Sequence, residues 1–236
     1  VVSVMAANNE TGAVQPVAYV AAAVADRGVL VHCDAVQAAV SRETTLDEFG
    51  VDLLTVASHK LGGPTGVGIL ALRPGIDLEP VIHGGGQEVG RRSGTHNVAG
   101  IVGAVAALEA AVIDRKRFVA EVAEARHGFE ISLAAAIPDV AFTLGGAERL
   151  VQHTHLRIPG VDAETLLVRL DGLGLAASAG SACHSGAMAP SHVLTAMGMS
   201  PADAAGCVRF TFGWNTRPED GATAAAIVAA AVKALR

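Results

Sequence analysis

Residues 58–66 read SHKLGGPTG, and this stretch decides how the rest of the chain is interpreted. A short apolar run, residues 53–57, precedes it, so the pattern predicts a buried strand that ends in a tight loop. Glycines in such a loop let the backbone approach a ligand closely. Lys60 therefore becomes a candidate functional residue, although a lysine after a strand is ordinarily just a solvated loop residue.

The first 73 residues alternate strand-like and helix-like patterns. We expect strands at 1–7, 29–33, 53–57 and 67–73, the last two close enough to form a hairpin or to be near neighbours, and a helix from residue 16 to about 27. This alternation is typical of an α/β domain with a mostly parallel sheet. Ligands of such sheets bind at the carboxyl ends of the strands. Asn9, Asp34 and Lys60 each follow a predicted strand, so we expect these side chains to converge.

The remainder of the chain predicts a long helix and a smaller domain. Residues 97–137 contain few helix breakers, and strands are expected near 140–143, 155–158 and 207–212. Further helices are expected near 163–170, 191–197 and 218–235. We therefore assign residues 1–105 to a large cofactor-binding α/β domain. Residues 106–236 are assigned to the linking helix and a small α+β domain.

Composition excludes several classes of function. A formal net charge of −6 and the lack of a basic stripe argue against a nucleic-acid partner. No uncharged apolar stretch reaches the roughly 18–20 residues of a membrane span. The three cysteines are too few and too scattered for a disulfide framework, which favours a cytoplasmic protein. His153 and His155 form an H-x-H pair with no third ligand nearby, so we expect no metal site.

Asp34 and Lys60 together suggest a site for pyridoxal phosphate. A lysine amine can hold this cofactor as a Schiff base, and an acid can pair with its protonated pyridine nitrogen. Gln37 is placed to reach the ring oxygen, while Ser58 and His59 are placed to donate to the phosphate. Asp34 taken alone is explained equally well as the N-cap of a helix.

Cys183 lies in the small-residue segment GSACHSG at 180–186. An isolated cysteine is more often a buried apolar residue than a nucleophile. This segment offers no bulky neighbours, however, and a charged His184 would favour the thiolate. We therefore interpret Cys183 as an accessible nucleophile, and Cys33 and Cys207, which fall in predicted strands, as core residues.

Three further residues are candidates for binding anions or substrate. Arg209 can clamp the α-carboxylate of an amino acid, unless it is only a solvated arginine on an edge strand. Thr95 precedes a helix start, where free N–H groups favour a phosphate. Asn9 either donates to the cofactor or a substrate carboxylate, or simply forms a turn.

Taken together, these motifs resemble the cysteine desulfurases of the NifS/IscS type, which are class-V, fold-type-I pyridoxal-phosphate enzymes. The resemblance runs through ANNETG (7–12), HCDAVQA (32–38), SHKLGGPTGVG (58–68), HGGGQE (83–88), RSGT (92–95), GSACHSG (180–186), PSHVLTAMG (190–198) and VRFTFG (208–213). The family often has a serine where this chain has Ala57.

The resemblance implies a role for each candidate residue. Lys60 is the Schiff-base lysine, and Asp34 and Gln37 contact the pyridine nitrogen and the ring oxygen. Ser58 and His59 hold the phosphate, which Thr95 reaches in the partner subunit of a homodimer. Asn9 lies near the substrate and the ring, Arg209 anchors the substrate carboxylate, and Cys183 receives the sulfur of L-cysteine as a persulfide.

The resemblance also implies partners and alternatives. The sulfur would pass to an acceptor protein such as an iron–sulfur scaffold. The family's first third, with a phosphate loop and a ring-stacking histidine, would precede Val1; the chain opens on a core-strand pattern without an initiator methionine. The rivals are a selenocysteine lyase, an aminotransferase-like enzyme, which would need no loop cysteine, and an inactive, N-terminally truncated fragment.

Overall fold

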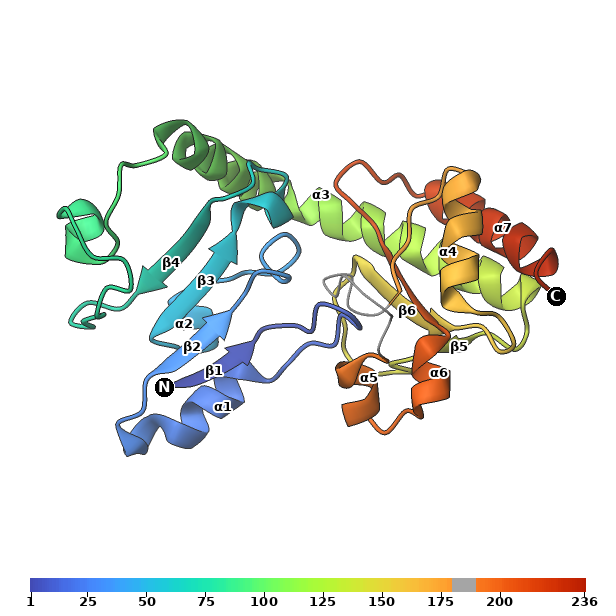
Figure 1. Cartoon of the computed structure of the whole chain (residues 1–236), viewed down its shortest axis with the longest axis horizontal. Helices are drawn as coiled ribbons and strands as arrows, with labels where there is room; N and C mark the ends of the chain where they lie inside the picture. Colours follow the sequence, from blue (N-terminus) through green and yellow to red (C-terminus); the bar gives the residue numbers. More distant parts are fainter. Residues whose placement is uncertain (180–189) are drawn as a thin grey trace. The chain divides into compact units, whose positions relative to one another are not determined.

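A four-stranded sheet organises the first part of the chain (Figure 1). In the computed structural model, which describes residues 1–179 and 190–236, its strands are β1 (Val2–Met5), β2 (Val31–Asp34), β3 (Leu53–Ala57) and β4 (Gly68–Leu72), in that order across the sheet. The strands β1, β2 and β3 are parallel, and β4 is antiparallel to β3. The predicted mostly parallel sheet and its terminal hairpin are therefore confirmed.

Two helices of this part follow the local sequence signals. Helix α1 (Val17–Val24) begins after Pro16, buries Val17, and continues as the short 3-10 helix η1 (Ala25–Arg27). Helix α2 (Leu46–Phe49), which we did not predict, is capped by Thr45, whose hydroxyl accepts from Glu48 N at 3.0 Å. Four residues are too few to show a helical period, so only the cap could have indicated α2.

Helix α3 (Val98–Ala136) confirms the long helix predicted at 97–137. Small residues near its beginning let it pack closely on the loop that follows β3. A Cβ at Gly103 would lie 2.7 Å from Pro64 Cγ, and one at Gly100 would lie 2.9 Å from Val67 Cγ2. The loop that carries Lys60 therefore rests on a rigid element.

The second part of the chain contains a small antiparallel sheet. Its strands are β5 (Ala141–Phe142), β6 (His153–Arg157) and β7 (Cys207–Thr211), with β6 in the centre. We predicted β6 at 155–158; the strand begins two residues earlier because buried His153 belongs to it. A polar residue inside a core strand conceals the apolar pattern from which strands are predicted.

The described residues of this second part form four more helices, and three of them were predicted. They are α4 (Ala163–Gly172), α5 (His192–Ala196), α6 (Pro201–Ala205) and α7 (Asp220–Lys233). The unpredicted one is α6, which is only five residues long. The ring of Phe129 in α3 lies 5.0 Å from that of Phe210 and 5.8 Å from that of Phe212, centroid to centroid, so α3 and β7 share one core.

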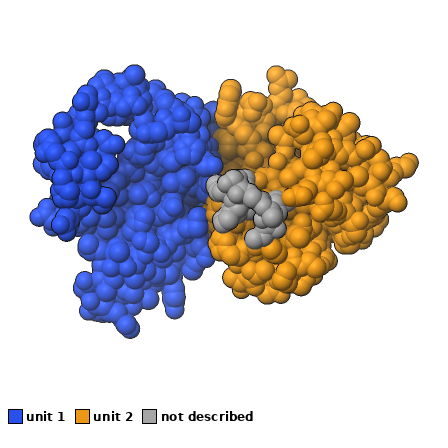
Figure 2. All heavy atoms as spheres, viewed as in Figure 1, with its two compact units in different colours: residues 1–6, 15–115 blue, residues 7–14, 116–236 orange. Residues whose placement is uncertain are grey.

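The contacts divide the chain into two compact units, coloured separately in Figure 2. The first unit comprises residues 1–6 and 15–115, and the second comprises residues 7–14 and 116–236. Residues 7–14 are held to the rest of the second unit by backbone hydrogen bonds. Val14 N donates to Glu148 O at 3.0 Å, and Leu150 N donates to Gly12 O at 2.9 Å. The domain division expected at residue 105 stays a prediction.

No helix in the described ranges is long and apolar enough to span a membrane.

Candidate active site

Asp34 and Lys60 follow neighbouring parallel strands in the first unit. Asp34 is the last residue of β2 and is in register with Thr55 of β3, and Lys60 follows the end of β3. Because β2 and β3 run in the same direction, both residues lie at the carboxyl edge of the sheet. This is the edge at which ligands of α/β sheets bind.

Asp34 is not the N-cap of a helix. Its Oδ1 accepts from Val36 N at 3.0 Å, which closes a turn, and residues 36–41 continue as turns. The next helix, α2, begins only at Leu46. The alternative interpretation of Asp34 is therefore wrong. Gln37, which is half-buried, belongs to the same turn region.

The loop after β3 presents Lys60 and His59 to solvent and buries Ser58. These three residues belong to the short 3-10 helix η2 (Ser58–Leu61). Within the described part of the chain, Ser58 Oγ has no hydrogen-bond partner although the residue is fully buried. A Cβ at Gly63 would lie 2.3 Å from this oxygen, so the loop needs glycine there for a close approach. An exposed amine, an unpartnered hydroxyl and a nearby carboxylate are groups that fit pyridoxal phosphate.

Thr95 lies between the 3-10 helix η3 (Gln87–Gly90) and α3, and it is exposed. Its neighbours are held in place: Ser93 Oγ donates to Gly85 O at 2.7 Å, and Gly94 N donates to Gln87 Oε1 at 3.2 Å. An exposed threonine in a fixed loop is compatible with a contact to a second protomer. Its role at a partner's phosphate stays a prediction.

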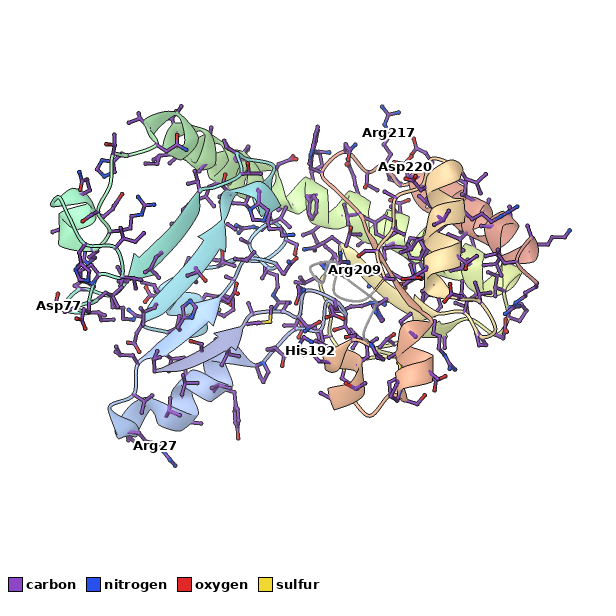
Figure 3. All side chains as sticks on the ribbon, in the orientation of Figure 1. Arg27, Asp77, His192, Arg209, Arg217 and Asp220 are labelled. Atoms are coloured by element: carbon purple, nitrogen blue, oxygen red, sulfur yellow. The ribbon has the colours of Figure 1, made fainter. Side chains whose placement is uncertain are left out.

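Arg209 and Asn9 meet in the second unit. Arg209, labelled in Figure 3, lies on β7 and is half-buried; its Nη1 donates to Asn9 O at 2.8 Å. The turn that presents this carbonyl is built by Asn8, whose Oδ1 accepts from Glu10 N and from Thr11 N, both at 2.9 Å. The turn and the functional interpretation of Asn9 are therefore compatible.

The backbone of Arg209 is paired on both sides. Besides its register partner His155 in β6, Arg209 exchanges two backbone hydrogen bonds with Ser178, at 2.7 and 3.1 Å. Arg209 is therefore not a solvated arginine on a free strand edge. A guanidinium fixed in this way is suited to bind a carboxylate.

A buried pair, Glu10 and Ser191, was not found by reasoning from the sequence. Their side chains are buried in the second unit, and Ser191 Oγ donates to Glu10 Oε2 at 2.5 Å. The two residues are separated by 181 positions. Only the acidic residue inside the ANNETG motif hinted at a special environment, because an ordinary turn would leave Glu10 in solvent.

His155 is a neutral residue beside Arg209. Its burial and, to a lesser extent, the positive charge of Arg209 lower its pKa to about 4. Its Nδ1 lies 2.6 Å from Thr143 Oγ1. Among the residues that the structure describes, no three histidine, cysteine or acidic side chains are grouped to hold a metal ion.

The other two cysteines are core residues, as predicted. Both are buried and free. Burial and then the charge of Asp34 raise the pKa of Cys33 to about 12, and burial raises the pKa of Cys207 to about 11. Neither is a thiolate near neutral pH, so neither is a nucleophile. Cys183 lies outside the described residues.

The candidate residues thus form two sets. The first unit carries Asp34, Gln37, Ser58, His59, Lys60 and Thr95, and the second carries Asn9 and Arg209. An α/β sheet with an acid and a lysine at the ends of neighbouring parallel strands fits the fold-type-I class of pyridoxal-phosphate enzymes that we expected. The contact roles of the individual residues stay predictions.

Comparisons with known proteins identify the family. The model of the aminotransferase class-V family matches residues 1–221, so the chain belongs to that family. Its members depend on pyridoxal 5′-phosphate. The chain is 38% identical over 219 residues to the cysteine desulfurase IscS of Dictyoglomus turgidum and 39% identical over 220 residues to the cysteine desulfurase NifS of Azotobacter vinelandii. These matches cover 93% of this chain but only 56% and 55% of the relatives, so the chain spans about half their length.

Solved structures agree with this assignment. A NifS-like protein superposes with a TM-score of 0.86 at 33% identity, over 98% of this chain and 60% of that protein. A NifS-like protein from Rickettsia africae gives a TM-score of 0.87 at 27% identity, over 99% and 61% of the two chains. The fold expected from the sequence is therefore confirmed.

Proposed function

We propose that this chain is part of a pyridoxal-phosphate-dependent cysteine desulfurase, which converts L-cysteine to L-alanine and keeps the sulfur on Cys183. The observation that carries this proposal is the position of Asp34 and Lys60 at the ends of neighbouring parallel strands. The names of the relatives support cysteine as the substrate. They favour it over the alternative substrate selenocysteine.

The first unit supplies the residues that hold the cofactor. When bound, pyridoxal phosphate acts as a sink for the electrons released at the substrate's Cα. Lys60 Nζ would hold the cofactor covalently and would move the Cα proton of the substrate. The Asp34 carboxylate would keep the pyridine nitrogen protonated, and Gln37 would donate to the ring oxygen. His59 and Ser58 would donate to the phosphate.

The second unit supplies the residues that hold the substrate. Arg209 Nη1 donates to the carbonyl of Asn9, which holds the guanidinium in place, and the planar guanidinium is the group proposed to bind the substrate α-carboxylate. The Cys183 thiolate attacks the sulfur of bound cysteine. The S–S bond forms as the C–S bond of the substrate breaks, and the electron pair of the broken bond stays with the substrate carbon. That carbon takes up a proton, and alanine leaves.

The proposal includes partners that follow from this chemistry. A persulfide on Cys183 requires an acceptor, for which a scaffold protein for iron–sulfur clusters is the proposed class. Thr95, exposed in a fixed loop, is proposed to complete the phosphate site of a second protomer in a homodimer. The free thiols of Cys33 and Cys207 support a reducing compartment such as the cytoplasm.

Cys183→Ala tests the proposal in the full-length, cofactor-loaded protein. The variant should keep the yellow colour of bound cofactor and its spectral response to cysteine, yet release almost no alanine. The matched control is Cys207→Ala, which removes a buried thiol that packs against Met199 in the core and should retain turnover. Wild-type turnover by Cys183→Ala would contradict the persulfide step. A selenocysteine lyase would instead turn over selenocysteine while leaving cysteine unreacted.

A further inference from the structure

We infer that Glu10 is a positioning residue, which fixes Ser191 relative to Arg209 for the sulfur-transfer step. The inference rests on the proposed function, because that function makes Cys183 the sulfur acceptor. By sequence, Cys183 lies between Ser178 and Ser191. Both of these flanking residues belong to the described part of the chain.

The carboxylate of Glu10 is buried and accepts a hydrogen bond from the Ser191 hydroxyl. Glu10 is 2% exposed and Ser191 is 6% exposed, and the Ser191 hydroxyl donates to Glu10 Oε2 at 2.5 Å. A buried carboxylate requires such donors, because water is not available to replace them. Hydrogen bonds to charged groups are also shorter and stronger than neutral ones. The contact therefore holds Ser191 more firmly than a surface contact would.

A second hydrogen bond of Ser191 Oγ fixes the orientation of its hydroxyl group. Its Oγ accepts from Leu194 N at 3.2 Å, in the first turn of α5, and Leu194 is fully buried. The hydroxyl hydrogen is then directed to Glu10 while a lone pair caps the helix. Ser191 is thus bound on one side to the core through α5 and on the other side to residues 8–12.

Arg209 is the common point of both attachments. Asn9 directly precedes Glu10 in the same turn, and its carbonyl oxygen accepts a hydrogen bond from Arg209 Nη1 at 2.8 Å. Ser178 is attached to the backbone of Arg209 by two hydrogen bonds. Ser178 is therefore attached to the backbone of Arg209, whereas Ser191 is connected to the Arg209 guanidinium through Glu10 and the neighbouring Asn9 carbonyl. Reacting groups need such fixed geometry, since small displacements are costly in rate.

Loss of the contact should affect sulfur transfer and leave substrate binding intact. In the cofactor-loaded, full-length protein, Glu10→Ala and Ser191→Ala should each lower kcat about tenfold to a hundredfold. The cysteine affinity from spectral titration should stay within about twofold, because Asn8 builds the turn under Arg209 independently. Glu10→Gln and Ser191→Thr keep an acceptor and a hydroxyl, and they should restore most of the rate.

A matched control separates positioning from helix capping. Ser200 caps the neighbouring five-residue helix α6, where its Oγ accepts from Asp203 N at 3.1 Å and donates to Asp203 Oδ2 at 2.9 Å, within its own helix. Ser200→Ala should therefore change kcat by less than about twofold. Equal losses in Ser191→Ala and Ser200→Ala would overturn the inference, as would wild-type kcat in Glu10→Ala.

A stability measurement completes the test without any turnover. Urea unfolding of the two single variants and of Glu10→Ala/Ser191→Ala forms a double-mutant cycle, which should show strong coupling. Additive effects would overturn the contact itself. Coupling together with unchanged kcat would overturn the positioning role. A wild-type protein that releases no alanine would refute the proposed function, and the inference would fall with it.

Discussion

Replacing Arg209 with lysine should weaken cysteine recognition by a predictable amount. Arg209 Nη1 donates to Asn9 O at 2.8 Å, and the same guanidinium is proposed to bind the substrate carboxylate as a second acceptor. A single ammonium on a flexible stem cannot serve both acceptors with the same geometry. The variant therefore loses about one hydrogen bond to a charged group, or roughly 1.5–3 kcal/mol. At 1.4 kcal/mol per factor of ten, kcat/KM for cysteine should fall roughly 10-fold to 150-fold.

Alanine formation measured against cysteine concentration checks this value. Most of the loss should fall on KM, while the absorbance of the bound cofactor stays unchanged, since Asp34 and Lys60 are untouched. The control is Arg157→Lys in β6 of the same sheet, whose guanidinium pairs with Asp203 instead. It should keep kcat/KM within about twofold. A normal KM in Arg209→Lys would refute the role of Arg209.

Three further variants test the cofactor site, the core and the buried histidine. Lys60→Ala should lose the cofactor that borohydride fixes to the protein, and peptide mapping that placed the wild-type adduct on another lysine would contradict the assignment. Gly221→Ala should lower the free energy of unfolding, measured in urea, by about 3 kcal/mol or more, because the added Cβ would lie 1.9 Å from Ala125 O. The control is Gly128→Ala in α3, where an added Cβ would have no atom within 4 Å, so this change should be neutral or stabilising. The His155 pKa of about 4 in the folded protein lies below its value in the unfolded chain. As the pH falls, the unfolded chain therefore takes up the proton before the folded protein does, and the free energy of unfolding should fall by about 2 kcal/mol from pH 7 to pH 5. His155→Gln should lack this slope, and an unchanged slope would exclude His155 as its source.

The elements with local signals were predicted well. Strand β3 occupies the expected residues, because an apolar run is followed by a glycine-rich loop. Helix α3 was equally evident from a long stretch without breakers. The order of strand, acid, strand and lysine also placed Asp34 and Lys60 at one edge of the sheet, because parallel strands end on the same side.

Features that depend on distant contacts were not predicted. The Glu10–Ser191 pair joins residues 181 positions apart, and no local pattern shows that a turn glutamate is buried. The start of β6 was missed because His153 is polar but lies in the core. The short helices α2 and α6 contain too few residues for a period to emerge.

The second unit is assembled from two separate pieces of the chain, residues 7–14 and 116–236. A fragment that began at Lys116 would lack two hydrogen-bond acceptors, the Asn9 carbonyl for Arg209 and the Glu10 carboxylate for Ser191. A single crossover between residues 15 and 115, in the genes of two relatives, would likewise pair these residues with partners from the other parent. Chimaeric proteins should therefore tolerate exchange of the second unit only when both pieces come from the same parent, so the two pieces are expected to be inherited together.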